Sequence, residues 1–347
     1  CAALIYMPVF NAAAFLGYLL QATGRTSVYS MSTVIDRSAF VALAALAALL
    51  GGESYGVYIA VSIAAKLISL LFLISKNHRV VFAPGRVSWT QTAADISAGS
   101  RLLWGNLLGL LVVGTARIAV ILRWGDAEFG RVSLAITLSG LILQFAAQLG
   151  MVIFPALRQE GGEARQRILA RMRSASGLAL PAVFLIYFPA RLAVSAWLPR
   201  NTLEASSLVL LLPLCLFEGK TQLVHQTYLK VSRMETRLFK VNLLSAGVSI
   251  VLSFYSAFVL GSLEAVLLSA VLAAALRCFI SAYPMSEAGE RLTVLMELLS
   301  DLAVSAVFVC AALLLPGIAA FFVYVLFYAG FLLIRRSELS VLLPGRV

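Results

Sequence analysis

Long apolar segments separated by short polar ones run along the whole chain. Each segment has roughly 20 mostly apolar residues, the length at which a helix crosses a bilayer. Transmembrane β-strands would be about 10 residues long with alternating polarity, and these segments show no such alternation. The pattern predicts an all-α polytopic membrane protein with about eleven transmembrane helices, near residues 1–23, 32–50, 54–75, 99–122, 129–154, 174–197, 203–228, 237–260, 262–283, 293–314 and 317–334.

Composition supports this class and narrows the chemistry. The chain is 61% hydrophobic and 12% charged, whereas soluble domains are about 45–50% apolar and about 25% charged. The net charge of +11 comes without a nucleic-acid-binding motif, so we expect no nucleic acid partner. The four cysteines and two histidines lack metal-ligand or redox spacing, so we expect no metal, no cofactor and no disulfide.

The basic residues are divided unevenly between the two ends of the predicted helices. When loops are assigned to alternate sides, 20 of the 27 Lys and Arg residues fall on one side, with Arg277 among them, and four fall on the other. Such an excess marks the cytoplasmic side of a membrane protein. We therefore predict a cytoplasmic C-terminus and, after eleven crossings, residue 1 on the outside. The remaining three basic residues lie within helices: Lys66, Arg117 and Lys220.

A weak internal repeat suggests a two-lobed organisation. The segment at 19–30 resembles that at 223–235, with Gln21 and Arg25 matching Gln226 and Lys230 at an offset of 205 residues. If the first helix matches the seventh, three helices precede residue 1 in the parent protein, giving fourteen in all. Two helical repeats around a central cavity are a common transporter plan. The expected parts are 1–75, the last three helices of an N-terminal lobe; 76–98, a cytoplasmic linker; 99–284, a six-helix C-terminal lobe; and 285–347, two final helices and a tail.

Polar residues follow helical spacing on several of the predicted helices. One stripe in 129–154 and one in 237–260 are continuous, which favours a hydrated cavity, although tight packing of small polar residues gives the same pattern. Asn106 lies eleven residues before Arg117, at almost the same angle on its helix. The two stripes comprise Ser133, Thr137, Gly140, Gln144 and Gln148, and Asn242, Ser245, Ser249, Ser253 and Ser256.

Charges within the predicted helices are the stronger functional signal. A charge at the centre of a bilayer helix costs roughly 2.5–3.5 kcal/mol on insertion scales. Glu218 and Lys220 are predicted either to pair for structural reasons or to face a cavity, and the same alternatives hold for Lys66 and Arg117. In the functional interpretation, these basic side chains line a cationic cavity that binds an anionic group of the substrate. Arginine suits this role because its guanidinium can donate two parallel hydrogen bonds to a phosphate.

Enzymatic chemistry is not indicated. No Ser/His/Asp set, carboxylate pair, phosphate-binding loop or metal cluster occurs in the sequence. The loops predicted outside the membrane are also short, which argues against a polysaccharide polymerase or ligase. We therefore predict a protein that is not an enzyme.

Three segments resemble a known family of transporters. Residues 95–159 resemble the start of the second lobe of polysaccharide repeat-unit flippases, which belong to the multidrug/oligosaccharidyl-lipid/polysaccharide exporter superfamily. The likeness lies in an in-helix Arg117, the segment Glu128-Phe129-Gly130 and the segment Phe154-Pro155-Ala156-Leu157. LLQATGRT at 19–26 and YGVYIAVSIAAKL at 55–67 resemble the first lobe of that family.

The resemblance implies an alternating-access flippase for an undecaprenyl-diphosphate-linked oligosaccharide in the bacterial inner membrane. It implies a proton or sodium as coupling ion, and other polysaccharide-assembly proteins as partners. Basic residues in the family's central cavity correspond to Arg117 and Lys66. The expected substrate-binding residues are Arg117, Lys66, Asn106, Gln144, Gln148, Lys220 and Glu218. The alternatives are a cation-coupled multidrug exporter, which needs an anionic cavity, and a membrane polymerase or ligase.

Overall fold

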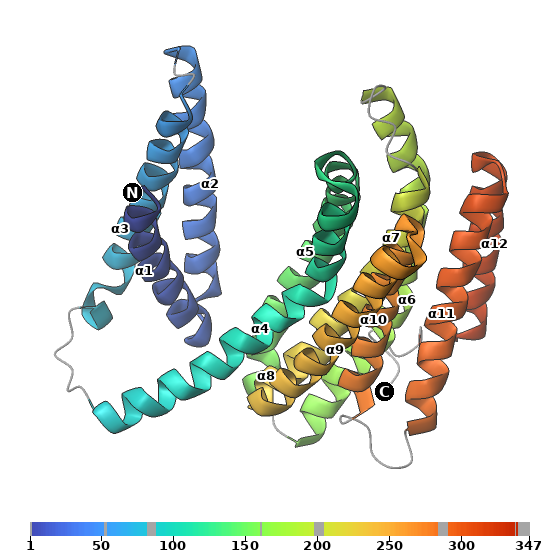
Figure 1. The fold of residues 1–347 in the computed structure, drawn as a ribbon. Coiled ribbons are helices and arrows are strands. Elements are labelled where there is room, and N and C mark those ends of the chain that lie inside the picture. Colours follow the sequence, from blue (N-terminus) through green and yellow to red (C-terminus); the bar gives the residue numbers. More distant parts are fainter. Residues whose placement is uncertain are drawn as a thin grey trace. The chain divides into compact units, whose positions relative to one another are not determined.

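The chain is built from helices. The computed structural model describes residues 2–51, 54–81, 88–159, 162–197, 205–283, 291–336 and 338, and no strand occurs among them. In chain order (Figure 1) the elements are α1 (Ala2–Ala22), α2 (Thr26–Leu49), α3 (Tyr55–Val81), α4 (Trp89–Trp124), α5 (Asp126–Gln159), α6 (Gly162–Trp197), α7 (Ala205–Lys220), the π-helical turn η1 (Thr221–Gln226), α8 (Thr227–Val231), α9 (Glu235–Tyr255), the π-helical turn η2 (Ser256–Leu260), α10 (Leu263–Ala282), α11 (Arg291–Leu314) and α12 (Gly317–Ile334).

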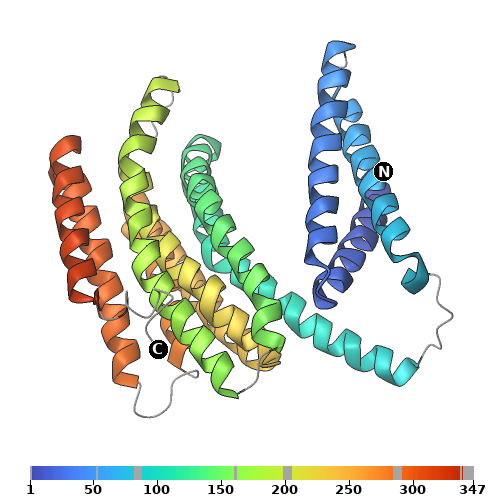
Figure 2. The same cartoon turned by 180° about the vertical axis from the view of Figure 1, so that it is seen from behind.

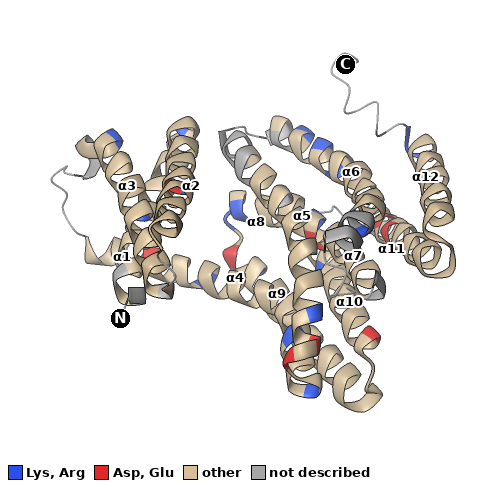
Figure 3. Cartoon of the chain, turned by 90° about the horizontal axis from the view of Figure 1, so that it is seen from above, with Lys and Arg blue, Asp and Glu red and all other residues tan. Residues whose placement is uncertain are grey.

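These helices are suited to a bilayer. Ten helical segments of the described chain are long and apolar enough to cross a membrane. The other expected segment is α1, which has 21 residues and no charged side chain. Large apolar side chains point outward, as at Leu49 and Ile334, which are 85% and 84% exposed, and charged residues are sparse along the ribbon (Figure 3). Exposed apolar surface of this extent marks contact with lipid, so the protein is an all-α, multi-pass membrane protein.

Two compact units make up the chain: unit 1, Cys1–Trp89, and unit 2, Thr90–Val347. The division falls within the segment 76–98, which the sequence predicts as a linker. Helices α3 and α4 extend into both ends of that segment, and residues 82–87 lie outside the described part. The last two helices belong to unit 2, where α11 packs on α6, α7 and α10, and α12 packs on α6.

Unit 1 is a three-helix assembly in which α3 packs against both α1 and α2. Its core contains Leu16, Leu20 and Leu73. Gly17 lets α1 approach α2 closely, because a Cβ at this position would lie 2.7 Å from the Tyr29 ring. Small residues permit this kind of helix contact in lipid, where no hydrophobic force draws helices together.

Unit 2 is organised around α7 and the π-helical turn that continues it. This helix contacts α5, α6, α10 and α11, and Figure 2 shows the helices of unit 2 from behind. Within Ser207–Val231, 94% of the most apolar 18-residue stretch is buried. An aromatic cluster joins α6, α11 and α12, with the Phe184 and Phe308 rings 4.6 Å apart. The Tyr324 hydroxyl donates a hydrogen bond of 2.8 Å to the Pro181 carbonyl oxygen. This hydrogen bond and the ring contacts fix α12 against α6.

The two segments matched by the predicted repeat both lie at helix ends that have the same kind of turn, and the repeat itself stays a prediction. Both α1 and α8 end in a turn with one residue of positive φ, Gly24 at 78° and Arg233 at 53°. In each turn, a backbone N–H bonds to a carbonyl five residues earlier, the 6→1 bond of a Schellman motif. These bonds are Arg25 N–H to Leu20 O at 2.8 Å and Met234 N–H to Leu229 O at 2.9 Å.

Corresponding residues of the two turns are 209 positions apart, whereas the sequence match has an offset of 205. The sequence match pairs Arg25 with Lys230, but Lys230 lies inside α8, whereas Arg25 follows the turn at the end of α1. The connections after the next helix in each segment are also similar, because each has a glycine with positive φ. Gly51, with φ of 76°, follows α2, and Gly261, with φ of 63°, follows η2. Just as α3 packs on α1 and α2, α10 packs on α7 and α9.

Candidate functional site

The buried charges of the described part of unit 2 meet around the end of α7. Glu218 and Lys220 occupy the last turn of α7, and both are buried. They point to different partners, because residues two positions apart lie on different faces of a helix. The sequence left open pairing with each other or with a neighbour, and the structure gives each residue a partner on another helix.

Arg277 of α10 is the partner of Glu218. Its side chain is 2% exposed, and one terminal nitrogen lies 2.9 Å from each Glu218 carboxylate oxygen. Arg277 Nε donates to Asn242 Oδ1 of α9 at 2.9 Å. The Gln222 amide also donates to Glu218 Oε1, at 3.0 Å. A buried pair is stable when further hydrogen bonds satisfy its remaining atoms, and this cluster meets that condition.

Two glycines bring α4 against this cluster. Asn242 Nδ2 donates to the Gly105 carbonyl at 2.7 Å, and Arg277 donates to the Gly109 carbonyl at 3.3 Å. A Cβ at Gly109 would lie 2.6 Å from an Arg277 terminal nitrogen. The guanidinium therefore joins α4, α7, α9 and α10, which differs from its expected place among the loop cations. The predicted charge asymmetry retains its direction without it.

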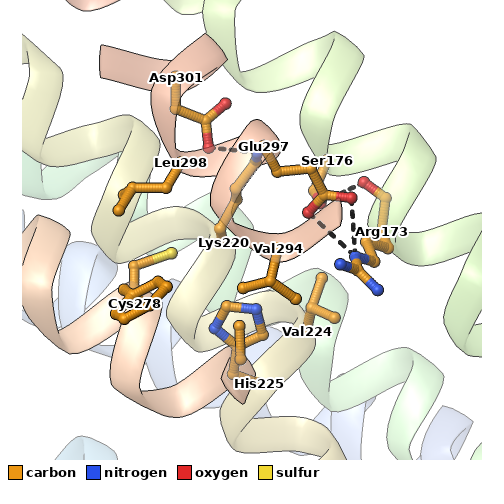
Figure 4. Close-up of a pocket in the computed structure, with 12 residues that line it drawn as sticks. Arg173, Ser176, Lys220, Val224, His225, Cys278, Val294, Glu297, Leu298 and Asp301 are labelled. Carbon is orange, nitrogen blue, oxygen red and sulfur yellow. Dashed lines mark hydrogen bonds and ion pairs between the residues drawn. The ribbon is translucent and has the colours of Figure 1, made fainter. Parts of the chain in front are cut away.

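Lys220 pairs with Asp301 of α11 at 2.5 Å, and both side chains are buried. Next to them, Arg173 Nε of α6 lies 2.9 Å from Glu297 Oε1. These two pairs line a cavity of about 20 Å³ together with His225 and Cys278 (Figure 4). A cavity needs about 10–15 Å³ to hold a water molecule, so this one admits water and excludes a sugar or a phosphate.

In unit 1, Lys66 of α3 pairs with Asp36 of α2 at 2.8 Å, and the two side chains are 16% and 14% exposed. The Lys66 ammonium also lies 5.3 Å from the centre of the Phe10 ring of α1. This cation, predicted as a substrate ligand, therefore has an anionic partner within its own unit.

Arg117 of α4 is the exception among the intramembrane cations. It is half-buried, and it forms no ion pair or hydrogen bond with the described residues. Its Nε atom is buried without a partner, and so is the Ser133 hydroxyl of α5. Burying a guanidinium nitrogen without a hydrogen bond is costly, so this atom indicates a partner that the described chain does not supply.

The predicted amide ligands lie on exposed faces of α4 and α5. Asn106, Gln144 and Gln148 are all exposed, as is Thr137 on the same stripe of α5. Polar side chains at membrane depth face a protein interior or water more often than lipid. The α5 stripe thus remains available for a polar partner.

The stripe on α9 has a different role from the hydrated lining that the sequence suggested. Ser249 is fully buried and donates to the Val112 carbonyl of α4 at 2.6 Å. Ser253 lies 3.2 Å from the Ser269 hydroxyl of α10. These serines hold α9 against α4 and α10, as small polar residues do in membrane bundles.

No family model, no curated protein and no solved structure matches this chain.

Two charged clusters are not predicted by the sequence pattern. Arg277 lies near the end of an apolar segment, where a basic residue is expected in a loop, although its neighbours Leu276 and Cys278 are apolar. Asp301 and Glu297 both lie inside the apolar segment at 293–314. An acidic residue within such a segment is itself a signal, and it would have supplied a partner for Lys220.

Proposed function

We propose that this chain belongs to a flippase that carries undecaprenyl-diphosphate-linked oligosaccharide repeat units across the bacterial inner membrane by alternating access. The observation that carries the proposal is the unpaired Arg117. Lys66, Lys220 and Arg277 each have a carboxylate partner, whereas Arg117 has none among the described residues. A diphosphate is an anion that a guanidinium binds through two parallel hydrogen bonds.

The exposed amides support the sugar half of this substrate. Gln144 and Gln148 follow one another at a spacing of four residues on α5, so they form one polar face. Each amide offers both donors and an acceptor to sugar hydroxyls. We assign Arg117 to the diphosphate and this face, with Asn106, to the oligosaccharide.

Lys66, Lys220 and Glu218 are less suited to direct binding, because the charge of each is already neutralised by a near neighbour. A multidrug exporter for organic cations would need a free acidic group. Asp36, Glu218 and Asp301 are paired in the described chain, which favours the anionic substrate.

The test is transport by the purified protein in lipid vesicles, with a fluorescent diphosphate-linked oligosaccharide lipid and an organic-cation dye as separate substrates. We expect the lipid to flip and the dye to be retained. Loss of one charged hydrogen bond, about 1.5–3 kcal/mol, weakens binding roughly 10- to 150-fold, so Arg117→Gln should lower the flipping rate at limiting lipid by that factor.

Arg123→Gln is the matched control, because Arg123 lies on the same helix and is exposed near its end. It should flip the lipid at the normal rate. Dye efflux without lipid flipping would reject the flippase. Normal flipping by Arg117→Gln would reject the role of Arg117 while leaving the substrate class in place.

A further inference from the structure

The charges around the cavity between α6, η1, α10 and α11 form a nearly closed set of ion pairs. The charged and titratable side chains in and around this cavity come from several elements besides Asp301 itself. They are Arg173 from α6, Glu218 and Lys220 from α7, His225 from η1, Arg277 and Cys278 from α10, Glu297 from α11, and Arg335 with Glu338 after α12. Each of the four cations has one carboxylate partner. With His225 neutral, the set carries no net charge.

The four carboxylates differ in how their oxygens are used. Both oxygens of Glu218 accept from Arg277, both of Glu297 lie 2.9–3.0 Å from Arg173 Nε, and both of Glu338 lie 2.7 Å from Arg335. Asp301 uses only Oδ2, to bind Lys220. Its Oδ1 atom is buried and has no hydrogen-bond partner among the described residues.

Two further features mark the same place. The cavity of about 20 Å³ lies against Asp301 and His225, and the buried Nδ1 atom of His225 also lacks a partner. His225 belongs to the π-helical turn Thr221–Gln226. Single π-helical turns inside helices occur frequently at functional sites, and this turn directly follows Lys220.

We propose that this cavity is a proton-binding site and that Asp301 is its acceptor. A proton delivered by water would bond to Asp301 Oδ1, converting the carboxylate to a carboxylic acid. Lys220 keeps its own protons and loses its anionic partner, so the set gains one positive charge. The cavity is large enough for the water that delivers the proton and too small for the transported lipid.

The site stands apart from the proposed substrate residues, and its existence does not depend on what the protein transports. Arg117, Gln144 and Gln148 do not line this cavity. Use of the bound proton to drive transport would rest on the proposed function, whereas proton binding can be measured without any transport.

Difference infrared spectroscopy of the purified protein in lipid vesicles tests the proposal. A protonated carboxylic acid has its own C=O stretching band, which an ionised carboxylate lacks. We expect this band to appear as the pH is lowered from neutral to mildly acidic. Labelling with side-chain ¹³C-aspartate should shift it, and the chain contains only four aspartates, at 36, 95, 126 and 301.

Asp301→Asn should remove the band, and Glu297→Gln, a control on the same helix and the same cavity, should retain it. Because Asp301→Asn leaves Lys220 without a partner and can fail to fold, the double variant Lys220→Met/Asp301→Asn removes both charges and should also lack the band. Absence of any aspartate-dependent band in the unaltered protein would overturn the proposal. So would its persistence in either Asp301 variant.

Discussion

Gly109 sets the distance between α4 and the Arg277 guanidinium. A Cβ here would lie 2.6 Å from one terminal nitrogen of Arg277, whose guanidinium is held through its other two nitrogens by hydrogen bonds to α4, α7 and α9. We therefore predict that Gly109→Ala lowers the free energy of unfolding by about 1–3 kcal/mol, the usual cost of overpacking. Denaturant titration in micelles, followed by fluorescence of the tryptophans, measures this change.

Gly114→Ala on the same helix provides the control, since nothing lies within 4 Å of a Cβ there. It should leave stability unchanged or raise it by up to about 1 kcal/mol, the helix preference of alanine over glycine. Equal stability of the two variants would show that Arg277 can move away without loss.

The Glu218–Arg277 pair gives a second prediction. Arg277→Met leaves a buried carboxylate without its partner and should lower the free energy of unfolding by about 3–5 kcal/mol. Adding Glu218→Gln removes the unpaired charge, so the double variant should recover most of that loss in the same titration. A double variant as unstable as Arg277→Met would mean that the cluster acts mainly through Asn242 and Gly109.

The sequence identified which charges are unusual but not how they pair. Glu218, Lys220, Lys66 and Arg117 stand out because each interrupts an apolar segment. The partners of the first three lie on other helices, 59 residues away for Glu218, 81 for Lys220 and 30 for Lys66. Contacts at such separations depend on how the helices pack, which a single sequence does not encode in any local pattern.

At the scale of the elements, the two Schellman turns place different residue types in the left-handed backbone conformation. Gly24 occupies it without strain, whereas Arg233 occupies it with a side chain, at φ of 53°. Since this conformation costs a non-glycine residue roughly 1–2 kcal/mol, Arg233→Gly should raise the free energy of unfolding by about 1 kcal/mol. Arg233→Ala keeps the strain and should give no gain, which separates backbone strain from the loss of a charge.

Helix existence was predictable, whereas helix ends were not. Each of the ten crossing helices overlaps one of the predicted apolar segments, because the bilayer requires an apolar length of about 20 residues. Helices α4, α5 and α6 continue for 34–36 residues, beyond the expected segments, since helix can persist in polar sequence outside the apolar core. The π-helical turn at Thr221–Gln226 was not predictable, because nothing in the segment TQLVHQ distinguishes a π-helical turn from an ordinary α-helix.

For the molecule as a whole, the predicted repeat leads to a prediction of membrane topology. Equivalent helices of a parallel repeat run in the same direction, so their connections lie on the same side. A parallel repeat therefore predicts that the turn after α1 shares a side with the turn after α8, and that Gly51 shares the other side with Gly261. The uneven distribution of Lys and Arg makes the same assignment by a separate physical route, the preference of basic loops for the cytoplasm.

This agreement predicts the sidedness of four exposed positions, each tested as a single cysteine in a chain without its native cysteines. Thr23→Cys and Arg237→Cys flank the two Schellman turns, whereas Asp126→Cys and Glu264→Cys begin α5 and α10. In intact cells, a membrane-impermeant maleimide should label positions 126 and 264 and should reach 23 and 237 only after permeabilisation. The reverse result would invert the topology and contradict the charge argument. Labelling of 23 and 237 from different sides would instead reject a parallel repeat, because corresponding turns would then lie on opposite faces of the membrane.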